Sequence, residues 1–215
     1  MSEHPADLNS LLLRYFPETT SKQLNKFSQL VEQVREWNTR VNLISRKDIE
    51  NLNERHLLHS LAAARVWHPQ PGNQVADLGT GGGFPGLPLA IFYPRCRFTL
   101  VDSVAKKARA VEEIAKTLKL KNVRVLNERA EILKSKYDYI FGRAVAPLPQ
   151  FLEWSLPLVR RGKGGRPGHG VFYFKGTHYL KELEGHPRQP SHVWKLDDFF
   201  DEPYFSEKFL LHFKR

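Results

Sequence analysis

The segment VADLGTGGGFPG, residues 75–86, is the part of the sequence that decides the fold. Two apolar residues lead into Asp77, and a run rich in glycine follows. A short apolar run that ends in glycines is typical of a β-strand followed by a tight turn, because glycine adopts backbone conformations that other residues avoid. Pro85 is suited to the first turn of a helix. The segment therefore predicts a strand, a glycine loop and a helix over residues 84–92.

Downstream of this segment, short apolar runs alternate with helical patterns. Strands that alternate with helices in this way are typical of a doubly wound α/β sheet, which is the fold class we predict. The further strands are expected at residues 98–101, 123–125, 137–141, 171–174, 192–195 and 209–213, and the further helices at 104–118 and 149–158.

Upstream of the glycine loop the sequence is helical in character. Within residues 20–37, Leu24, Phe27 and Val31 recur at three- and four-residue spacing, which predicts an amphipathic helix. A second amphipathic stretch runs from about residue 48 to residue 66 and predicts a second helix.

A break in the pattern separates these helices from the rest of the chain. Residues 69–72 read PQPG, a combination that ends regular structure. We therefore expect an N-terminal helical region over residues 1–70, packed on the core, and a main domain over residues 71–215.

Composition limits the classes of function. The 215 residues include 33 Lys and Arg against 23 Asp and Glu, a net charge of +10, with 41% hydrophobic residues. This content excludes a disordered chain, and the excess of positive charge favours a polyanion such as nucleic acid as a partner. The single cysteine, Cys96, excludes a disulfide framework and a multi-cysteine zinc site. Without an apolar run long enough for a membrane span, or a secretory signal, we expect a soluble cytoplasmic protein.

The glycine loop is compatible with two kinds of cofactor. Gly81, Gly83 and Gly86 match the dinucleotide fingerprint, and Asp102 follows where an acid that binds ribose belongs. A nicotinamide- or flavin-dependent oxidoreductase is therefore one reading. Asp77 opposes it, because a pyrophosphate at this turn would meet a carboxylate of like charge. S-adenosylmethionine carries no phosphate, and its ammonium and sulfonium groups favour a carboxylate, so we predict a methyltransferase.

Three positions at the ends of later strands are further candidates. Asp102 can accept both ribose hydroxyls of a cofactor lying across the strand ends, although it can equally cap the helix that follows. The polar segment 127–131 follows the third strand, where an adenine edge would lie or where the chain is simply a solvated loop. Arg143 closes the fourth strand, and an arginine at the end of a buried strand favours a binding role.

The sequence contains no clear general base or nucleophile. Cys96 lies between two arginines and outside a Pro-Cys loop, so a covalent adduct to a pyrimidine is not expected. His56 and His59 have no acidic third ligand at a fitting spacing, so we expect no metal site. Guanine N7 carries a lone pair and no proton to lose, so its methylation needs no base. The missing base permits this acceptor without singling it out.

Taken in order, these motifs resemble one known family. The chain resembles the RsmG (GidB) family of small-subunit ribosomal RNA guanine-N7 methyltransferases from about residue 37 to residue 176. The loop at residues 77–88, DLGTGGGFPGLP, is the most specific match. The supporting matches are Trp37-Asn38, Asn42-Leu43, Arg55-His56-Leu-Leu, Leu100-Val-Asp102-Ser103, Gly142-Arg143-Ala144 and Phe174-Lys175-Gly176.

The resemblance implies a fold, a cofactor and a substrate. The fold is that of class I S-adenosylmethionine-dependent methyltransferases, a Rossmann-like, seven-stranded, mostly parallel sheet with an N-terminal helical cap. The implied substrate is a guanine in small-subunit ribosomal RNA, free or in a ribosomal particle, methylated by a monomer. With the resemblance included, the expected cofactor-binding residues are Asp77, Gly79, Gly81, Gly83, Phe84, Asp102, Ala130, Glu131 and Arg143. The expected RNA-binding residues are Asn38, Arg55, Arg143 and Lys175.

Two features depart from the family pattern. The family usually carries an acid where this chain has His59, so a contact that depends on that acid is absent here. Residues 160–170 are longer and more basic than the expected short turn, which suggests an extra contact with the RNA backbone. A non-catalytic RNA-binding module with a vestigial pocket is a further alternative, and a test for methyl transfer distinguishes it.

Overall fold

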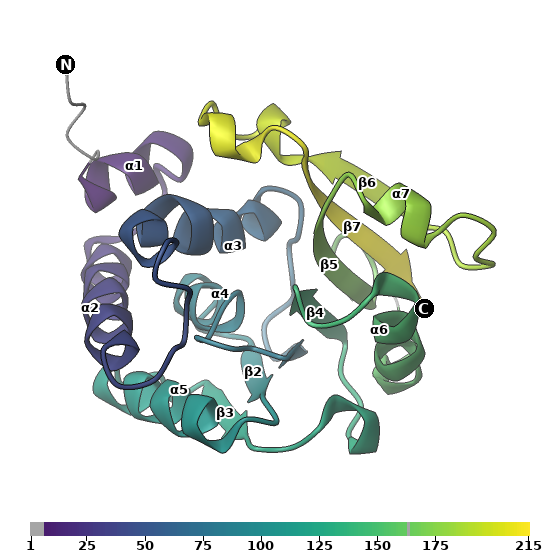
Figure 1. Cartoon of the computed structure of the whole chain (residues 1–215), viewed down its shortest axis with the longest axis horizontal. Helices are drawn as coiled ribbons and strands as arrows, with labels where there is room; N and C mark the ends of the chain where they lie inside the picture. The colour runs from purple at the N-terminus through teal and green to yellow at the C-terminus, as the bar shows by residue number, and fades with distance from the viewer. Residues whose placement is uncertain (1–6, 163) are drawn as a thin grey trace.

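A computed structural model of the chain describes residues 7–162 and 164–215. In this part of the chain a central sheet contains seven strands in the order β3-β2-β1-β4-β5-β7-β6 (Figure 1). The first five strands in this order are parallel to one another, and β7 is antiparallel to both β5 and β6. The mostly parallel α/β fold predicted from the sequence is confirmed. The strands are β1 Gln74–Leu78, β2 Arg97–Val101, β3 Val123–Leu126, β4 Tyr139–Arg143, β5 Gly170–Gly176, β6 His192–Lys195 and β7 Lys208–Lys214.

The sheet separates two hydrophobic clusters. In β5, Phe172 and Phe174 point into one cluster, while Val171 and Tyr173 point into the other. This alternation is the period of two that a strand buried on both faces imposes on its side chains. The first cluster is covered by α1 Leu8–Tyr15, α2 Ser21–Asn38, α3 His59–Leu61, α4 Gly86–Phe92 and α5 Ala105–Thr117. The second is covered by α6 Leu148–Ser155 and α7 Tyr179–Glu182.

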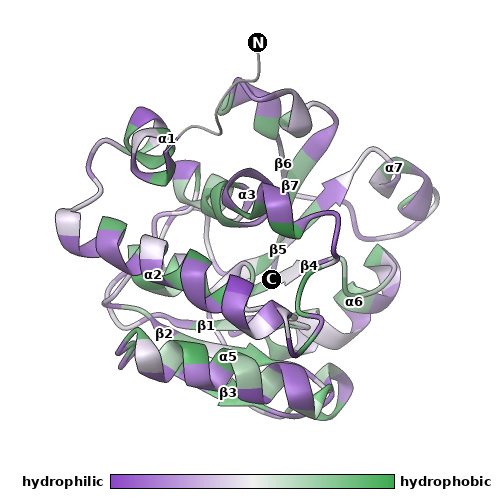
Figure 2. Cartoon of the chain, turned by 60° about the vertical axis from the view of Figure 1, so that its left-hand side comes forward, coloured by the Kyte–Doolittle hydropathy of each residue, from purple (hydrophilic) through white to green (hydrophobic). Residues whose placement is uncertain are grey.

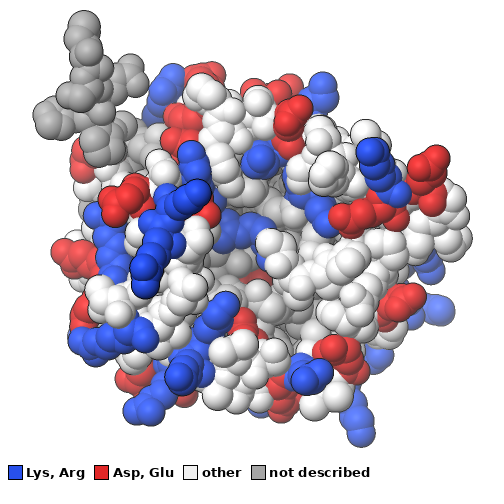
Figure 3. All heavy atoms as spheres, in the orientation of Figure 1, with Lys and Arg blue, Asp and Glu red and all other residues white. Residues whose placement is uncertain are grey.

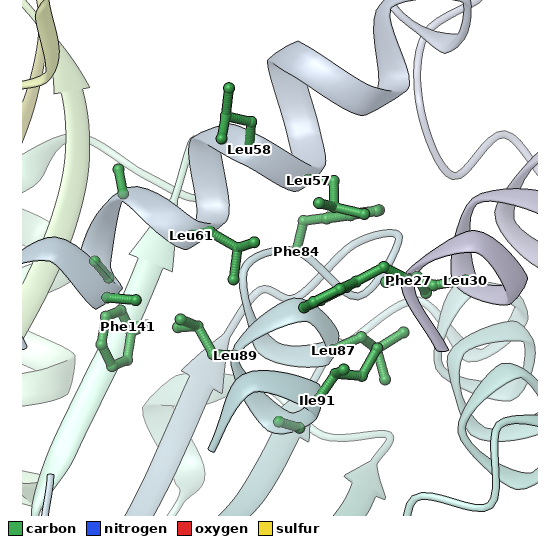
Figure 4. Packing of buried hydrophobic residues seen from close by; sticks show 14 of the residues in the cluster. Phe27, Leu30, Leu57, Leu58, Leu61, Phe84, Leu87, Leu89, Ile91 and Phe141 are labelled. Atoms are coloured by element: carbon green, nitrogen blue, oxygen red, sulfur yellow. The ribbon is translucent and has the colours of Figure 1, made fainter. Parts of the chain in front are cut away.

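The helix predicted over residues 20–37 is confirmed as α2. Its first turn is closed by a capping box, in which Thr20 and Gln23 each accept a hydrogen bond from the other's backbone amide. Its apolar side meets the glycine-loop helix: Phe27 lies beside Leu87 and Ile91 of α4 (Figure 4). Figure 2 shows hydrophilic residues on the outer side of α2 and of its neighbour α5. The N-terminal helices and the sheet therefore share one core.

The single regular helix predicted over residues 48–66 is wrong in detail. The segment consists of a 3₁₀ turn Ile49–Asn51, a π-helical turn Leu52–Leu58, the short α3 and a second 3₁₀ turn Ala62–Arg65. Leucines of this segment lie above α4 in the core (Figure 4). A π turn inserts a residue into the helical repeat and is frequent at functional sites. Here Arg55, His56 and His59 all face the same cavity.

Smaller corrections concern where elements begin. The helix expected from residue 84 begins at Gly86, and the strand expected at residues 137–141 is β4, Tyr139–Arg143. The reason for the second shift is Asp138, whose carboxylate accepts hydrogen bonds from Asn73 and from the backbone of Gln74 at the start of the sheet. Because β4 extends two residues further than predicted, Arg143 is its last residue.

Among the described residues, no helix has both the length and the apolar character that crossing a bilayer demands.

Candidate active site

A cleft of about 670 Å³ lies at the carboxyl ends of β1, β2 and β4. This is the edge at which open α/β sheets bind their ligands, and the volume lies in the range of about 300–1,000 Å³ usual for small-molecule sites. Its walls come from the glycine loop, from the irregular helix around His56, and from the segment that ends at Lys208. The face drawn in Figure 3 is hollowed near its centre, and Lys and Arg side chains lie in and around the hollow.

Asp77 shapes the glycine loop from behind. Its Oδ2 accepts hydrogen bonds from the Thr80 hydroxyl at 2.6 Å and from the backbone amide of Gly86 at 2.9 Å. Its Oδ1 is buried without a hydrogen-bond partner. Burial raises the pKa of this carboxyl to about 7. The side chain lies behind the loop and outside the cleft wall, so it shapes the cleft through Thr80 and Gly86, and its expected contact with the cofactor stays a prediction.

The glycines of the loop have different roles. Gly79 and Gly81 line the cleft, whereas Gly83 does not. Gly79 has a φ of +69°, a conformation costly for other residues, and a Cβ there would lie 2.7 Å from Val145. A Cβ at Gly83 would clash with Leu87 at the start of α4. Gly83 therefore allows close packing of the loop on the helix.

Gly86 gives a testable prediction about the packing behind the cleft. A Cβ at this position would clash with Leu100 and would lie 2.8 Å from Oδ2 of Asp77. We expect Gly86→Ala to lower the free energy of unfolding by about 1–3 kcal/mol, as overpacking of a core does. Urea denaturation measures this change. Gly168→Ala is the control, because its nearest neighbours would lie 3.9 Å and 4.0 Å away; equal stability of both variants and the wild type would contradict the prediction.

Asp102 lines the cleft just after the end of β2. Its carboxylate also accepts hydrogen bonds from the backbone of the glycine loop and of the residue before α5. Its Oδ2 accepts from the amide of Gly81 at 2.8 Å, and its Oδ1 accepts from the amide of Val104 at 2.8 Å, just before α5 begins. The N-cap residue of α5 is Val104 and no side chain caps this helix, so the capping alternative is not borne out, and the contact of Asp102 with ribose stays a prediction.

Ala130 and Glu131 lie outside the cleft wall. They form a 3₁₀ turn, Ala130–Ile132, beyond the end of β3. The nearer part of this loop is attached to the site, because the Asn127 side chain donates to the backbone carbonyl of Asp102 at 2.9 Å. Contact of Ala130 and Glu131 with a cofactor stays a prediction.

Arg143 reaches into the cleft from the end of β4. Its Nη2 lies 2.9 Å from Nδ1 of His56, and its Nη1 donates to the backbone carbonyl of Arg55 at 3.3 Å. Burial, followed by the nearby guanidinium, lowers the pKa of His56 to about 3, so this imidazole is neutral and its Nδ1 accepts. The guanidinium also lies over the ring of Phe84, 5.7 Å from its centroid.

The guanidinium of Arg143 forms no ion pair with any described residue. Over residues 7–162 and 164–215, no carboxylate oxygen lies within 4.0 Å of its guanidinium. His59, where the resembling family has an acid, is 5% exposed and also lines the cleft. Its Nδ1 lies 3.2 Å from the Tyr204 hydroxyl, and its Nε2 has no hydrogen-bond partner. Burial lowers the pKa of His59 well below its ordinary value. The cleft therefore presents a buried cation whose direct contacts are neutral groups, with Asp77 and Asp48 acting on its charge only from beyond ion-pair distance.

The residues expected on the RNA side fall into two groups. Arg55 and Lys175 line the cleft, where Arg55 pairs with Asp48 at 3.2 Å and Lys175 with Glu182 at 2.6 Å. Asn38 lies outside the cleft wall. Its Oδ1 accepts the backbone amides of residues 43 and 44, both at 2.9 Å, and so holds the turn that places Leu43 and Ile44 in the wall.

Several cleft residues were not among the candidates from the sequence. His56 stood within a matched motif, but only the fold shows that it holds Arg143. Tyr204 and Lys208 come from the C-terminal segment, and the Arg55 guanidinium lies over the Tyr204 ring at 5.3 Å. No local pattern signals a contact between residues about 150 positions apart.

The basic segment 160–170 does not border this cleft. It leads into the amino end of β5, Arg160 pairs with Asp138 at 3.2 Å, and Arg166 shares backbone hydrogen bonds with His68. Lys163 lies outside the described residues. The predicted extra RNA contact would thus be at the opposite end of the sheet, and it stays a prediction.

The described residues contain no group of three or more His, Cys, Asp or Glu side chains arranged to hold a metal ion.

Comparison with known proteins identifies relatives over most of the chain. Residues 23–200 match the family described as GidB, rRNA small subunit methyltransferase G. The protein named ribosomal RNA small subunit methyltransferase G from Christiangramia forsetii is 41% identical over 198 residues, covering 92% of this chain and 93% of that protein. The protein of the same name from Bacteroides fragilis is 42% identical over 198 residues, covering 92% and 96%.

Solved structures share the fold at low sequence identity. A SAM dependent methyltransferase from Aquifex aeolicus superposes with a TM-score of 0.55 at 18% identity, covering 79% of this chain and 98% of that one. TrmN from Thermus thermophilus gives a TM-score of 0.54 at 19% identity, covering 74% and 48%.

The sheet itself argues against a dinucleotide-dependent oxidoreductase. The usual dinucleotide-binding sheet has the order 3-2-1-4-5-6, whereas here the antiparallel β7 lies between β5 and β6. The class I methyltransferase fold expected from the sequence is confirmed by this topology and by the structural neighbours. The chain belongs to the rRNA small subunit methyltransferase G (GidB) family.

Proposed function

We propose that this protein transfers the methyl group of S-adenosylmethionine to N7 of a guanine in small-subunit ribosomal RNA. One observation carries the proposal: a single cleft combines a glycine loop and the Asp102 carboxylate with Arg143, a buried cation that forms no ion pair with the described residues. The first pair suits a nucleoside cofactor without phosphates, and the cation suits a polyanionic acceptor. Family membership supports ribosomal RNA as that acceptor.

The residues present fit S-adenosylmethionine, which supplies an electrophilic methyl group when bound. The backbone of Gly79 and Gly81 lies open to the cleft, and the Asp102 oxygens lie where ribose hydroxyls can replace the Gly81 amide as donors. Phe84 forms part of the wall under Arg143. We place the adenine towards the 3₁₀ turn at Ala130–Ile132, which Asn127 ties to Asp102.

The acceptor atom agrees with the chemistry of the cleft. Burial keeps the pKa values of His56 and His59 low, and Nδ1 of His56 is occupied by Arg143, so neither imidazole is an effective base at neutral pH. Guanine N7 needs none, because its lone pair attacks directly. Holding the two reacting atoms in line can supply about 7–11 kcal/mol. We assign this orienting role on the RNA side to Arg143.

The remaining expectations form part of the same proposal. Residues 1–70 act as a cap on the methyltransferase domain of residues 71–215, since Leu43, Arg55 and His56 from the cap line the cleft. Arg55 and Lys175 meet RNA at the cleft, and Asn38 supports the wall. The protein acts as a monomer without metal, in the cytoplasm, on RNA or on a small-subunit particle.

Two measurements test the proposal. S-adenosylhomocysteine at about 100 times its dissociation constant should stabilise the protein by about 2.7 kcal/mol, or about 5–10 °C in melting temperature, whereas NAD should give no shift. Small subunits that lack the modification should then accept labelled methyl groups at guanine N7. A shift with NAD alone would contradict the cofactor assignment. Binding of S-adenosylhomocysteine without transfer to subunits or to their RNA would favour a non-catalytic RNA-binding module.

A further inference from the structure

A second basic surface lies far from the cleft. A groove of about 1180 Å³ runs between the first half of α2, the end of α4 and the end of α5. Its lining includes no Asp or Glu. We call it the basic groove after its six basic lining residues, which are Lys22, Lys26, Arg95, Arg97, Lys119 and Lys121. Within the part of the chain that the structure describes, none of these six forms an ion pair.

Hydrogen bonds fix the walls of the basic groove. The Gln23 amide of α2 donates to two backbone carbonyls at the end of α4, at 3.2 Å and 3.0 Å. The Asn122 amide donates to two carbonyls that flank the turn after α4, at 3.0 Å and 3.2 Å. The Lys26 ammonium donates to the backbone carbonyl of Leu118 at the end of α5. Three side chains thus connect the three walls, and the cations lie on a preformed surface.

The cations of the basic groove are close enough to repel one another. Burial lowers the pKa of Lys26, and the charges of Lys22 and Lys119 lower it further. Like charges in one place cost stability in the free protein, and a bound polyanion removes that cost. The basic groove therefore has the electrostatic character of a surface that binds phosphates.

The basic groove is at the opposite end of the sheet from the cleft. It borders the start of β2 at Arg97, whereas the cleft lies beyond the end of the same strand, at Asp102. Five residues of strand span about 13 Å, and the loops at either end add to this separation. A nucleotide that reaches into the cleft therefore cannot also place its own phosphate among Lys22, Lys119 and Lys121.

We propose that the basic groove binds backbone phosphates of a second segment of the RNA substrate, remote from the methylated nucleotide. The inference rests on the proposed function, which makes RNA the substrate. The large hydrophobic residues that the described chain exposes are Leu13, Val104, Ile132, Leu180 and Val193, and none of them lines the basic groove. The groove therefore presents no large exposed hydrophobic side chain for insertion into a membrane, and its six cations favour a polyanion. Because the cleft and the basic groove, at opposite ends of the sheet, would contact different RNA segments, the protein would recognise a folded RNA.

Two triple variants of equal charge test this proposal. The groove variant carries Lys22→Gln, Lys119→Gln and Lys121→Gln, three exposed residues with no hydrogen bond that fixes the walls. The control carries Lys181→Gln, Arg188→Gln and Lys195→Gln, exposed residues that line neither the cleft nor the basic groove. Binding of each protein to unmodified small subunits is measured by co-sedimentation between 50 and 300 mM salt, and methyl transfer is measured alongside.

The expected result is a loss confined to the groove variant. The slope of log K against log salt is negative, and each lost phosphate contact makes it about 0.7–0.9 less steep. The slope of the groove variant should therefore be about 2–3 less steep, and its binding about tenfold weaker or worse at 150 mM salt. KM for subunits should rise, with affinity for S-adenosylhomocysteine unchanged. Equal losses in both variants would show an effect of net charge and overturn the proposal.

The remaining outcomes also decide the matter. An unchanged slope in the groove variant overturns the proposal, even if the wild type methylates subunits normally. Loss of binding to vesicles of phosphatidylserine and phosphatidylcholine, with subunit binding intact, overturns it in favour of a lipid surface. Failure of the wild type to transfer methyl contradicts the proposed function only, because subunit binding is measured independently of transfer.

Discussion

Replacing Arg143 by alanine should leave the protein folded and lower the rate of methyl transfer to small subunits by about 100-fold or more. The guanidinium is held by two neutral acceptors, Nδ1 of His56 at 2.9 Å and the carbonyl of Arg55 at 3.3 Å, and by no carboxylate. Its removal abolishes an unpaired buried charge, so the fold loses little. The acceptor base loses the group that orients it, and a misplacement of about 1 Å can cost about 100-fold in rate. Single-turnover transfer with saturating S-adenosylmethionine measures the effect.

Two further variants separate the charge of Arg143 from its shape. Arg143→Lys keeps the charge but cannot donate in two directions from one plane, so its rate should lie between those of the wild type and the alanine variant. Arg40→Ala is the matched control, because Arg40 is exposed and pairs only with Glu36 on the surface of α2. Full activity in Arg143→Ala, with unfolding by urea unchanged, would remove Arg143 from the site.

Local sequence signals were sufficient to predict that the residues following three strands form one site. The glycine loop, Asp102 and Arg143 each follow a parallel strand, and parallel strands end at one edge of a sheet, so the sequence alone predicts that these residues meet. The cleft does bring Gly79, Asp102 and Arg143 together. The alternation of strands and helices likewise predicted the sheet, and the +10 charge predicted a polyanionic partner.

Other parts of the site depend on packing between distant segments. Nothing in the pattern around Tyr204 indicates that it meets His59 and Arg55, because that contact needs β6 to lead the chain to the carboxyl end of β5, where Tyr204 lies just before β7 begins. Asp77 was predicted as a cofactor contact because a carboxylate favours the cationic groups of S-adenosylmethionine, and Asn38 was placed on the RNA side by the family resemblance. Their partners, the Thr80 hydroxyl and the Gly86 amide for Asp77 and two backbone amides for Asn38, became visible only with the fold.

Mild acid should weaken this protein through three buried imidazoles. Burial is the largest cause of the pKa shift in each of them. The pKa of His56 is lowered to about 3, that of His212 to about 4, and that of His59 well below 6.5. In the unfolded chain these groups titrate near 6.5. Between pH 6.5 and their folded values the unfolded state therefore binds more protons than the native state, and the free energy of unfolding falls as pH falls.

The carboxyl of Asp77 acts in the opposite direction. Burial raises its pKa from 3.8 to about 7, so between those values the native state binds the extra proton and gains stability as pH falls. From pH 7.5 to pH 5.5 the three histidines together remove about 4 kcal/mol and Asp77 returns about 2 kcal/mol. The wild type should therefore lose about 2 kcal/mol over this interval.

Urea denaturation at both pH values tests this balance with two variants. Asp77→Asn stays neutral throughout, so it should lose about 4 kcal/mol between pH 7.5 and pH 5.5, roughly twice the loss of the wild type. His212→Gln keeps a side-chain donor for the Gly168 carbonyl, 3.1 Å from Nε2, but cannot titrate, so its loss should shrink to about 1 kcal/mol. Because His212 lies outside the cleft, this change should leave binding of S-adenosylhomocysteine intact. Equal pH dependence in all three proteins would show that these groups titrate alike in the folded and unfolded chain, and the burial argument for a neutral His56 beneath Arg143 would fail with it.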